Sequence, residues 1–153
     1  MRLPRPVTPK PPSPKYDAVM ISLDTTVLVR YLAQDEPTQS TVASTLLERQ
    51  LSADHPGHVS TLVLAELYCV LTRLYGIGRA QFADIAHGLL TARNLRFDDL
   101  QAAWNALQAY EDGLDFVAAL CAEQAHNAGC DYTATFDPEF SRHPKARLLA
   151  ASA

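Results

Sequence analysis

Four acidic residues of this chain stand where their carboxylates could act together. Asp24 and Asp137 each follow an apolar run typical of a buried strand, Glu66 lies inside LVLAELYCVL, and Asp115 opens LDFVAALCAEQA. The carboxyl ends of parallel strands meet at one edge of a sheet, so these acids can converge there. Carboxylates that close repel one another unless a cation that prefers oxygen ligands lies between them. Magnesium or manganese suits this set, whereas zinc would favour His or Cys ligands.

Each acid also has an ordinary structural role open to it. Asp24 and Asp115 both precede a predicted helix, where an aspartate commonly caps the first turn. Asp137 precedes a proline and could form an Asx turn. Glu66 could lie at the edge of its helix and reach solvent or a basic partner such as Arg73. Its apolar neighbours favour a ligand role instead, because a buried, unpaired carboxylate is costly.

The segments around these acids alternate between short strands and helices. Their periodicity predicts helices over 25–33, 37–51, 62–75, 79–92, 99–110 and 115–128, and strands over 19–23, 58–61, 95–97, 132–136 and 146–149. Asp98 is expected to cap the fifth helix, with Leu100 on its buried face, and Val42 is expected on the buried face of the second. Such alternation predicts an α/β fold with a mainly parallel sheet, covered by helices on both faces and richer in helix than in strand.

Length and charge set limits on the function. The 153 residues are one domain's length, and the net charge of −4 gives no basic surface of the kind that marks many nucleic-acid binders. Bound divalent cations could still attract an RNA phosphate. Residues 1–18 are proline-rich and are expected to be a disordered or polyproline-like extension, with the folded domain over 19–150. The chain has no apolar run suited to a membrane span or a signal peptide.

The three cysteines include no CxxC pair. Cys69 and Cys121 fall within apolar helical patterns and are expected to be reduced thiols in the core. This usage suggests a reducing, cytoplasmic setting.

Several motifs, taken in order, resemble those of the PIN-domain ribonucleases, and specifically VapC-type toxins of toxin–antitoxin pairs. They are LDTTVLVRYL, then LVLAELYCVL followed by Leu74-Tyr75-Gly76, and finally LDFVAALCAEQAHNAGCDYTATFDPEF. No one of them is specific, but their order and spacing over residues 20–142 are. The resemblance implies a PIN-like three-layer α/β/α sandwich around a central, mainly parallel sheet.

The resemblance also implies an activity and a set of site residues. Asp24, Glu66 and Asp137 match acids that act in metal-dependent cleavage of RNA phosphodiester bonds. Asp24, Asp115 and Asp137 are the expected ligands of Mg²⁺ or Mn²⁺, and Asp115 is counted with the catalytic acids. The implied partners are the RNA substrate, a small VapB-like antitoxin that fills a groove between helices, and a second copy of the chain in a homodimer.

Three arginines near the acids, Arg30, Arg73 and Arg142, are candidate contacts to the RNA backbone. Ordinary surface ion pairing is the alternative for each of them.

Two positions depart from the family pattern. Thr26 replaces a usual asparagine and keeps a hydroxyl that could support the site. Ala118 stands where family members often carry a second acid, one turn after Asp115. Either Asp115 supplies the third carboxylate, or the site is weakened, or Ala118 is an inactivating change.

Two other functions compete with the nuclease hypothesis. One is a catalytically weakened or inactivated PIN-fold binding module. The other is a haloacid-dehalogenase-like phosphatase, which also places an aspartate after its first strand. That family needs a second aspartate two residues later, where this chain has Thr26.

Overall fold

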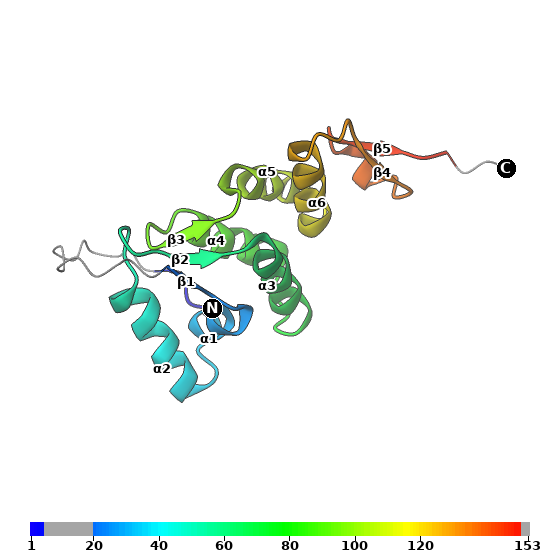
Figure 1. The fold of residues 1–153 in the computed structure, drawn as a ribbon. Helices are drawn as coiled ribbons and strands as arrows, with labels where there is room; N and C mark the ends of the chain where they lie inside the picture. Colours follow the sequence, from blue (N-terminus) through cyan, green and yellow to red (C-terminus); the bar gives the residue numbers. More distant parts are fainter. Residues whose placement is uncertain (5–19, 151–153) are drawn as a thin grey trace. The chain divides into compact units, whose positions relative to one another are not determined.

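A computed structural model describes residues 1–4 and 20–150 of the chain. The chain divides into two compact units, Met1–Leu100 and Gln101–Ala153, which are described separately below (Figure 1). Of the predicted extension over 1–18, only residues 1–4 are described. Residue 19, the first of the predicted strand over 19–23, also lies outside the described residues.

The first unit contains a three-stranded parallel sheet. Its strands are β1 (Ile21–Ser22), β2 (Gly57–Val59) and β3 (Leu95–Phe97), in the order β1-β2-β3. All pairs in this sheet are parallel, as predicted. Gly57 allows β2 to lie close to its neighbours, because a Cβ atom there would stand 2.7 Å from the Leu51 side chain. A side chain at this position would therefore push the layers apart.

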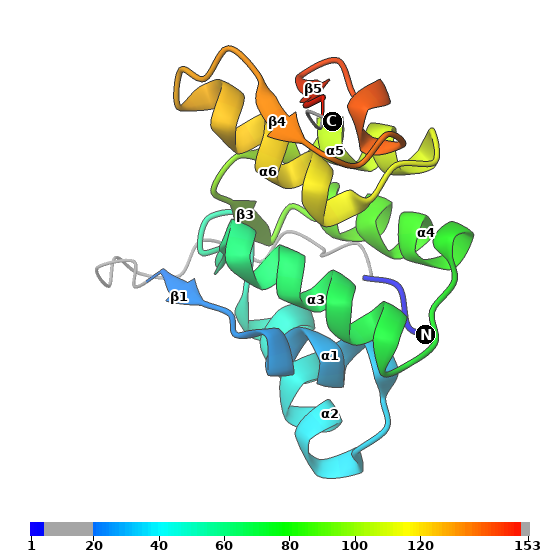
Figure 2. The ribbon, with the colours of Figure 1, turned by 90° about the vertical axis from the view of Figure 1, so that its right-hand side faces the viewer.

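Helices surround this sheet. They are α1 (Thr25–Ala33), α2 (Pro37–Thr45), α3 (Thr61–Arg73) and α4 (Arg79–Leu90), and a π-helical turn (Leu46–Gln50) continues α2. Figures 1 and 2 show α1 and α2 side by side toward the β1 end of the sheet, with α4 toward β3. The predicted boundaries are close to these, although the helix expected over 37–51 is divided in two. Pro37 begins α2, and the Glu36 carboxylate accepts a bond from the Gln39 amide at 2.5 Å.

The core of the first unit is formed by aliphatic side chains from every layer. Its most buried members include Leu23, Leu28, Leu32, Val59, Leu64, Leu67, Leu71, Ile85 and Leu89. The prediction for Val42 was wrong, since this side chain is 65% exposed. The inward face of α2 is formed instead by the small residues Ser40 and Ala43, which let α2 approach α1 closely, and the helix continues inward at Leu47.

Residues 1–4 pack against other parts of the first unit. The Arg2 amide donates to the Leu32 carbonyl at 2.7 Å, and the Arg2 guanidinium pairs with Glu48 at 2.9 Å. The same guanidinium stands 5.5 Å from the centre of the Tyr31 ring. Pro4 lies close to Gly88, where a Cβ would meet the proline ring at 2.9 Å. These contacts tie the first residues to α1, α4 and the turn after α2.

The second unit joins two helices to a two-stranded parallel sheet. It comprises α5 (Leu100–Glu111), α6 (Phe116–Asn127), β4 (Thr133–Thr135), a 3-10 turn (Phe140–Arg142) and β5 (Ala146–Leu148). Its core includes Ala103, Ala106, Leu107, Tyr110, Phe116, Ala119 and Leu120. Leu100 was wrongly predicted to face inward and is 44% exposed, because it is the first residue of α5 and precedes the turns that pack.

The cysteine prediction was also partly wrong. Cys121 is exposed and Cys69 is half-buried. The buried face of α6 is formed by Ala119, Leu120 and Ala122, so Cys121 points away from it. In the part of the chain that the structure describes, no helix is long and apolar enough to cross a membrane.

Candidate active site

Asp24 occupies the junction between the first strand and α1. The backbone at Asp24 is extended, and its carbonyl accepts a bond from the Val27 amide at 3.1 Å, as expected for the residue before a helix. Its carboxylate makes no capping bond to α1. Instead, one carboxylate oxygen accepts a bond from the Thr26 hydroxyl at 3.0 Å. The exposed carboxylate is therefore held by a neighbouring hydroxyl and is not consumed by capping.

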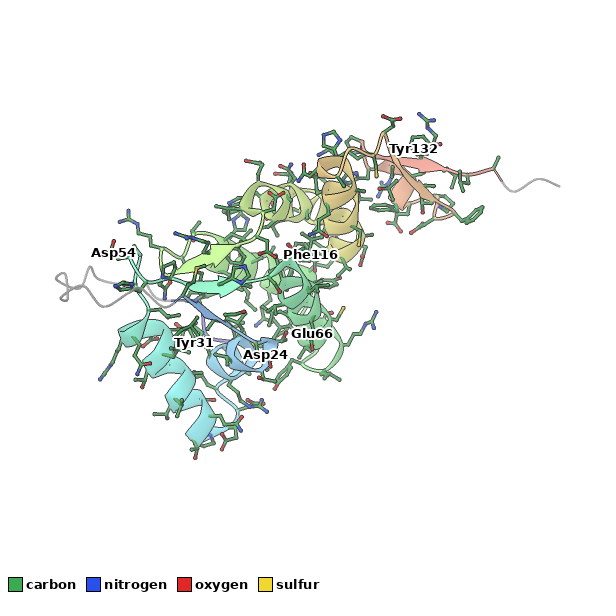
Figure 3. The ribbon with its side chains drawn as sticks, viewed as in Figure 1. Asp24, Tyr31, Asp54, Glu66, Phe116 and Tyr132 are labelled. Atoms are coloured by element: carbon green, nitrogen blue, oxygen red, sulfur yellow. The ribbon has the colours of Figure 1, made fainter. Side chains whose placement is uncertain are left out.

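Glu66 reaches the same region from α3. The Thr25 hydroxyl, on a side chain that is only 3% exposed, donates to a Glu66 carboxylate oxygen at 3.0 Å. Two adjacent threonines of α1 thus hold the two acids, and Figure 3 labels Asp24, just before α1, near Glu66 of α3. Glu66 is itself exposed at the edge of its helix. Burial therefore does not support a ligand role for Glu66, and its position beside Asp24 is the remaining support.

Asp115 takes the structural role that was its alternative. Its backbone is extended at the start of α6, and its carboxylate accepts a bond from the Ala118 amide at 2.7 Å. This is a helix cap. The alanine at position 118 adds no oxygen, so the first turn of α6 carries no acid, and the carboxylate of Asp115 before it is engaged as the cap.

Asp137 follows β4 and forms an Asx turn. One carboxylate oxygen accepts a bond from the Glu139 amide at 2.9 Å, and the Asp137 amide donates to the Thr135 hydroxyl at 3.0 Å. The Asp137 carbonyl accepts from the Ser141 amide at 3.0 Å. These bonds fix the backbone on both sides of Asp137, and within the described residues its second carboxylate oxygen accepts no hydrogen bond.

The four acids are therefore distributed between the units. Asp24 and Glu66 come together in the first unit, and Asp115 and Asp137 belong to the second. Within each unit, the described residues include no group of three His, Cys, Asp or Glu side chains placed to hold a metal ion.

Arg30 is part of an ion-pair network between α1 and the end of α3. Its guanidinium donates to Gln39 at 2.7 Å and to Asp35 at 3.3 Å. The Tyr75 hydroxyl donates to the other Asp35 oxygen at 2.6 Å. This bond from Tyr75, with help from Arg30, lowers the pKa of Asp35, and the Asp35 carboxylate raises the pKa of Tyr75. The tyrosine of the Leu-Tyr-Gly motif thus fastens the turn after α1.

The other two arginines differ in their surroundings. Arg142 lies 3.6 Å from the Glu139 carboxylate and donates to the Glu139 carbonyl at 3.3 Å. Arg73 is exposed at the end of α3. Surface ion pairing therefore describes Arg142, as it does Arg30, while Arg73 keeps its side chain toward solvent.

A further polar pair lies at the carboxyl ends of β2 and β3. The His58 Nε2 atom is 2.5 Å from Asp98, whose other oxygen accepts a bond from the Thr61 amide at 3.0 Å. The hydrogen bond from the Thr61 amide is the main cause that lowers the pKa of Asp98, and the hydrogen bond with His58 lowers it further. Asp98 was expected to cap the fifth helix, but its carboxylate supports the start of α3 instead. Sequence reasoning missed His58, because the only signal was one polar residue in a very short strand.

In this helix-rich α/β chain, exposed acids lie at the carboxyl edge of the parallel sheet, which is where ligand sites of such sheets gather. The family model of the PIN domain matches residues 21–146. This range covers most of the chain, which therefore belongs to the PIN domain family and has its α/β/α fold class. PIN domains are nucleases that act on RNA or other nucleic acid and typically depend on metal ions. A comparison with curated proteins finds no match. The family assignment gives no support to the phosphatase alternative.

Proposed function

We propose that this chain is a metal-dependent endoribonuclease that cleaves RNA phosphodiester bonds and serves as the toxin of a VapC-like toxin–antitoxin pair. The observation that supports this proposal is the pair of exposed acids, Asp24 and Glu66, held by adjacent threonine hydroxyls where β1 meets α1 in a chain of a nuclease family.

The donor set suits a hard cation. Neither Asp24 nor Glu66 forms an ion pair in the described part of the chain, and oxygen is the only donor atom that they offer. Asp137, in the second unit, offers the same donor type, which is the one that Mg²⁺ and Mn²⁺ prefer. A bound divalent cation would lower the pKa of the water molecule that it binds and would offset negative charge on the phosphate. Asp115 contributes less to this set, because its carboxylate already caps α6.

The chain's own residues would orient the reacting groups. The Thr26 hydroxyl fixes Asp24, and the Thr25 hydroxyl fixes Glu66. A positioned carboxylate can accept a proton from water near the phosphate. Arg73 is the candidate of the three arginines for a backbone phosphate, because Arg30 and Arg142 would first have to leave their acidic partners.

A groove beside the acids fits a protein partner. It has a volume of about 330 Å³ between α1 and α2 and a mainly apolar lining that includes Val27, Val42 and Leu46. Val42 stands exposed there, and Thr26 lines the same groove. An antitoxin segment with apolar side chains would cover Val42 and reach the neighbourhood of Asp24. The homodimer and the cytoplasmic location stay predictions from the resemblance and the cysteine usage.

A second candidate function is a PIN-fold binding module with weak or no cleavage activity. The specific observation in its favour is the start of α6, where Asp115 is used as the N-cap and Ala118 carries no carboxylate.

One assay separates these functions. Cleavage of a structured RNA is measured with Mg²⁺ and with chelator, for the unchanged chain and for Asp24→Ala, Ala118→Asp and Asp54→Ala. Asp54 is an exposed acid of the first unit that lies well apart from Asp24 (Figure 3), so its variant controls for the loss of one negative charge.

We expect Mg²⁺-dependent cleavage that Asp24→Ala abolishes and Asp54→Ala leaves intact. Cleavage that persists in chelator or in Asp24→Ala would contradict the proposed chemistry. Cleavage that occurs only in Ala118→Asp would identify an inactivated nuclease. RNA binding without cleavage, in the unchanged chain and in Ala118→Asp alike, would instead favour the binding module.

A further inference from the structure

Glu123 is a buried acid outside the candidate active site. It lies on α6 with 4% of its surface exposed. One of its oxygens accepts bonds from the Asn105 amide at 3.0 Å and from the Lys145 ammonium at 2.6 Å, and the other lies 3.7 Å from His143 Nε2. A carboxylate this deeply buried is costly unless it is paired and hydrogen-bonded. Its surroundings meet that requirement with partners from α5 and from the segment after β4.

The partners on that segment are themselves fixed by the backbone. Residues 140–145, called here the anchor segment, contain both His143 and Lys145. The Lys145 carbonyl accepts a bond from the Thr133 amide at 2.7 Å, which joins the end of the segment to the start of β4. The Lys145 amide donates to His143 Nδ1 at 3.1 Å, and the His143 ring stacks on buried Phe140. His143 Nδ1 is therefore an acceptor, and the opposite side of the ring faces Glu123.

Asp137 stands between β4 and the anchor segment. Its Asx turn leads directly into Phe140, and the Ser141 amide of the anchor segment bonds the Asp137 carbonyl at 3.0 Å. Backbone hydrogen bonds therefore fix the segment from β4 through Asp137 to β5 near both of its ends. Among the described residues, it is attached to the helices by the ion pair between Glu123 and Lys145 and by the contact of Glu123 with the His143 ring.

We propose that Glu123 is a positioning residue, which holds Asp137 in place by anchoring residues 140–145 to α5 and α6. The use of Asp137 as a metal ligand rests on the proposed function, whereas the anchoring of its turn does not. Asp112 and Arg142 line the cavity of about 510 Å³ beside this cluster. They are the other charged groups near it, and both are exposed.

The test is hydrogen exchange on the full chain, resolved over short peptides. Glu123→Gln keeps the shape and the acceptor for Asn105 but removes the charge that binds Lys145. We expect amide exchange over residues 137–145 to accelerate by about tenfold or more, while α5 and the rest of α6 change much less. Glu139→Gln is the matched control, because Glu139 forms an exposed pair with Arg142 in the same region and should leave exchange nearly unchanged.

A double variant separates positioning from general loss of stability. Glu123→Gln with Lys145→Met should exchange residues 137–145 no faster than Glu123→Gln alone, because the ion pair that each substitution removes is already lost in the single variant. Unchanged exchange in Glu123→Gln, or an increase spread evenly over the second unit, would overturn the proposal. If Glu123→Gln does not fold, Lys145→Met alone provides a second comparison: it removes the ion pair and leaves the buried Glu123 carboxylate without its charged partner, so exchange over residues 137–145 should rise at least as much.

The two proposals fail in different ways. A chain that cleaves no RNA but shows the local exchange increase would keep the anchoring proposal and lose the nuclease. If the chain does cleave RNA, Glu123→Gln should also raise the Mg²⁺ concentration needed for half-maximal cleavage, and the double variant should raise it to the same extent. A Mg²⁺ requirement that is unchanged in Glu123→Gln would contradict the link to Asp137.

Discussion

The bond between Thr25 and Glu66 gives a sharp test of how the acidic pair is held. The Thr25 side chain is 3% exposed, and its hydroxyl donates to Glu66 at 3.0 Å across 41 residues of sequence. Thr25→Val keeps the branched shape and removes the donor. We expect the variant to fold, to be less stable, and to leave the Glu66 carboxylate free to change rotamer.

The size of the effect follows from the surroundings of the two groups. A hydrogen bond to a charged group contributes roughly 1.5–3 kcal/mol when neither partner can turn to water. Glu66 is exposed and can be solvated again, and the methyl group that replaces the Thr25 hydroxyl gains from being buried. We therefore expect a loss of about 1 kcal/mol in the free energy of unfolding. This corresponds to a melting temperature lower by about 2–4 °C.

The assay is guanidinium denaturation followed by circular dichroism, combined with a Mn²⁺ titration. Thr45→Val is the matched control, because the Thr45 hydroxyl bonds a carbonyl of its own helix at 3.0 Å on an exposed face. Its stability should change by less than about 0.5 kcal/mol. The Mn²⁺ affinity should fall several-fold in Thr25→Val and stay unchanged in the control.

A double-mutant cycle decides whether the bond is the cause. In a Glu66→Ala background, Thr25→Val should have almost no further destabilising effect, because the acceptor is already gone. Equal destabilisation by Thr25→Val in both backgrounds would refute the reasoning. So would a Thr25→Val chain with full stability and unchanged Mn²⁺ affinity.

Three further predictions concern parts of the fold that support the site. Arg2→Ala should lower the unfolding free energy by about 1 kcal/mol in denaturation, since an ion pair and an aromatic contact are lost, while Arg49→Ala on the exposed surface should have little effect. Burial lowers the pKa of His143, so below pH of about 6.5 the unfolded chain binds a proton that the folded chain resists. Stability should fall as pH drops through that range, and His143→Gln should flatten the pH dependence of the melting temperature. The Thr61 amide lowers the pKa of Asp98. The ionised Asp98 carboxylate therefore stabilises the folded chain above pH of about 4, and this contribution is lost as pH falls. The difference in melting temperature between the unchanged chain and Asp98→Ala should therefore shrink between about pH 7 and about pH 3, which a pH series of thermal scans would measure.

The local features of this protein could be predicted from its sequence. The bounds of α1 agree with the prediction, because an extended residue precedes the helix and Gln34, in the left-handed conformation, ends it. The helix cap at Asp115 and the Asx turn at Asp137 were both foreseen as alternatives. Each of these depends on bonds between residues at most about four positions apart, where spacing fixes the geometry.

Burial was predicted less well, because periodicity shows that a helix has two faces but does not fix how closely the next element approaches. Val42 and Cys121 are apolar residues in regular helical patterns, yet both are exposed. The buried faces of these helices include small residues, such as Ala43 of α2 and Ala119 of α6, so the larger apolar residues alone did not identify the inward face.

The distant partners of Glu66 and Glu123 were decided by the tertiary structure alone. Glu66 was assigned to a site because of its apolar neighbours, but its position depends on Thr25, which the crossing of α1 and α3 brings beside it. Lys145 gave no signal in the sequence, and it is the closest partner of buried Glu123, 22 residues away. The sequence determined which acids are present and which elements carry them. Asp24, Asp115 and Asp137 are held by groups two or three residues away, whereas only the folding of distant elements onto one another decided that Thr25 holds Glu66 and Lys145 holds Glu123.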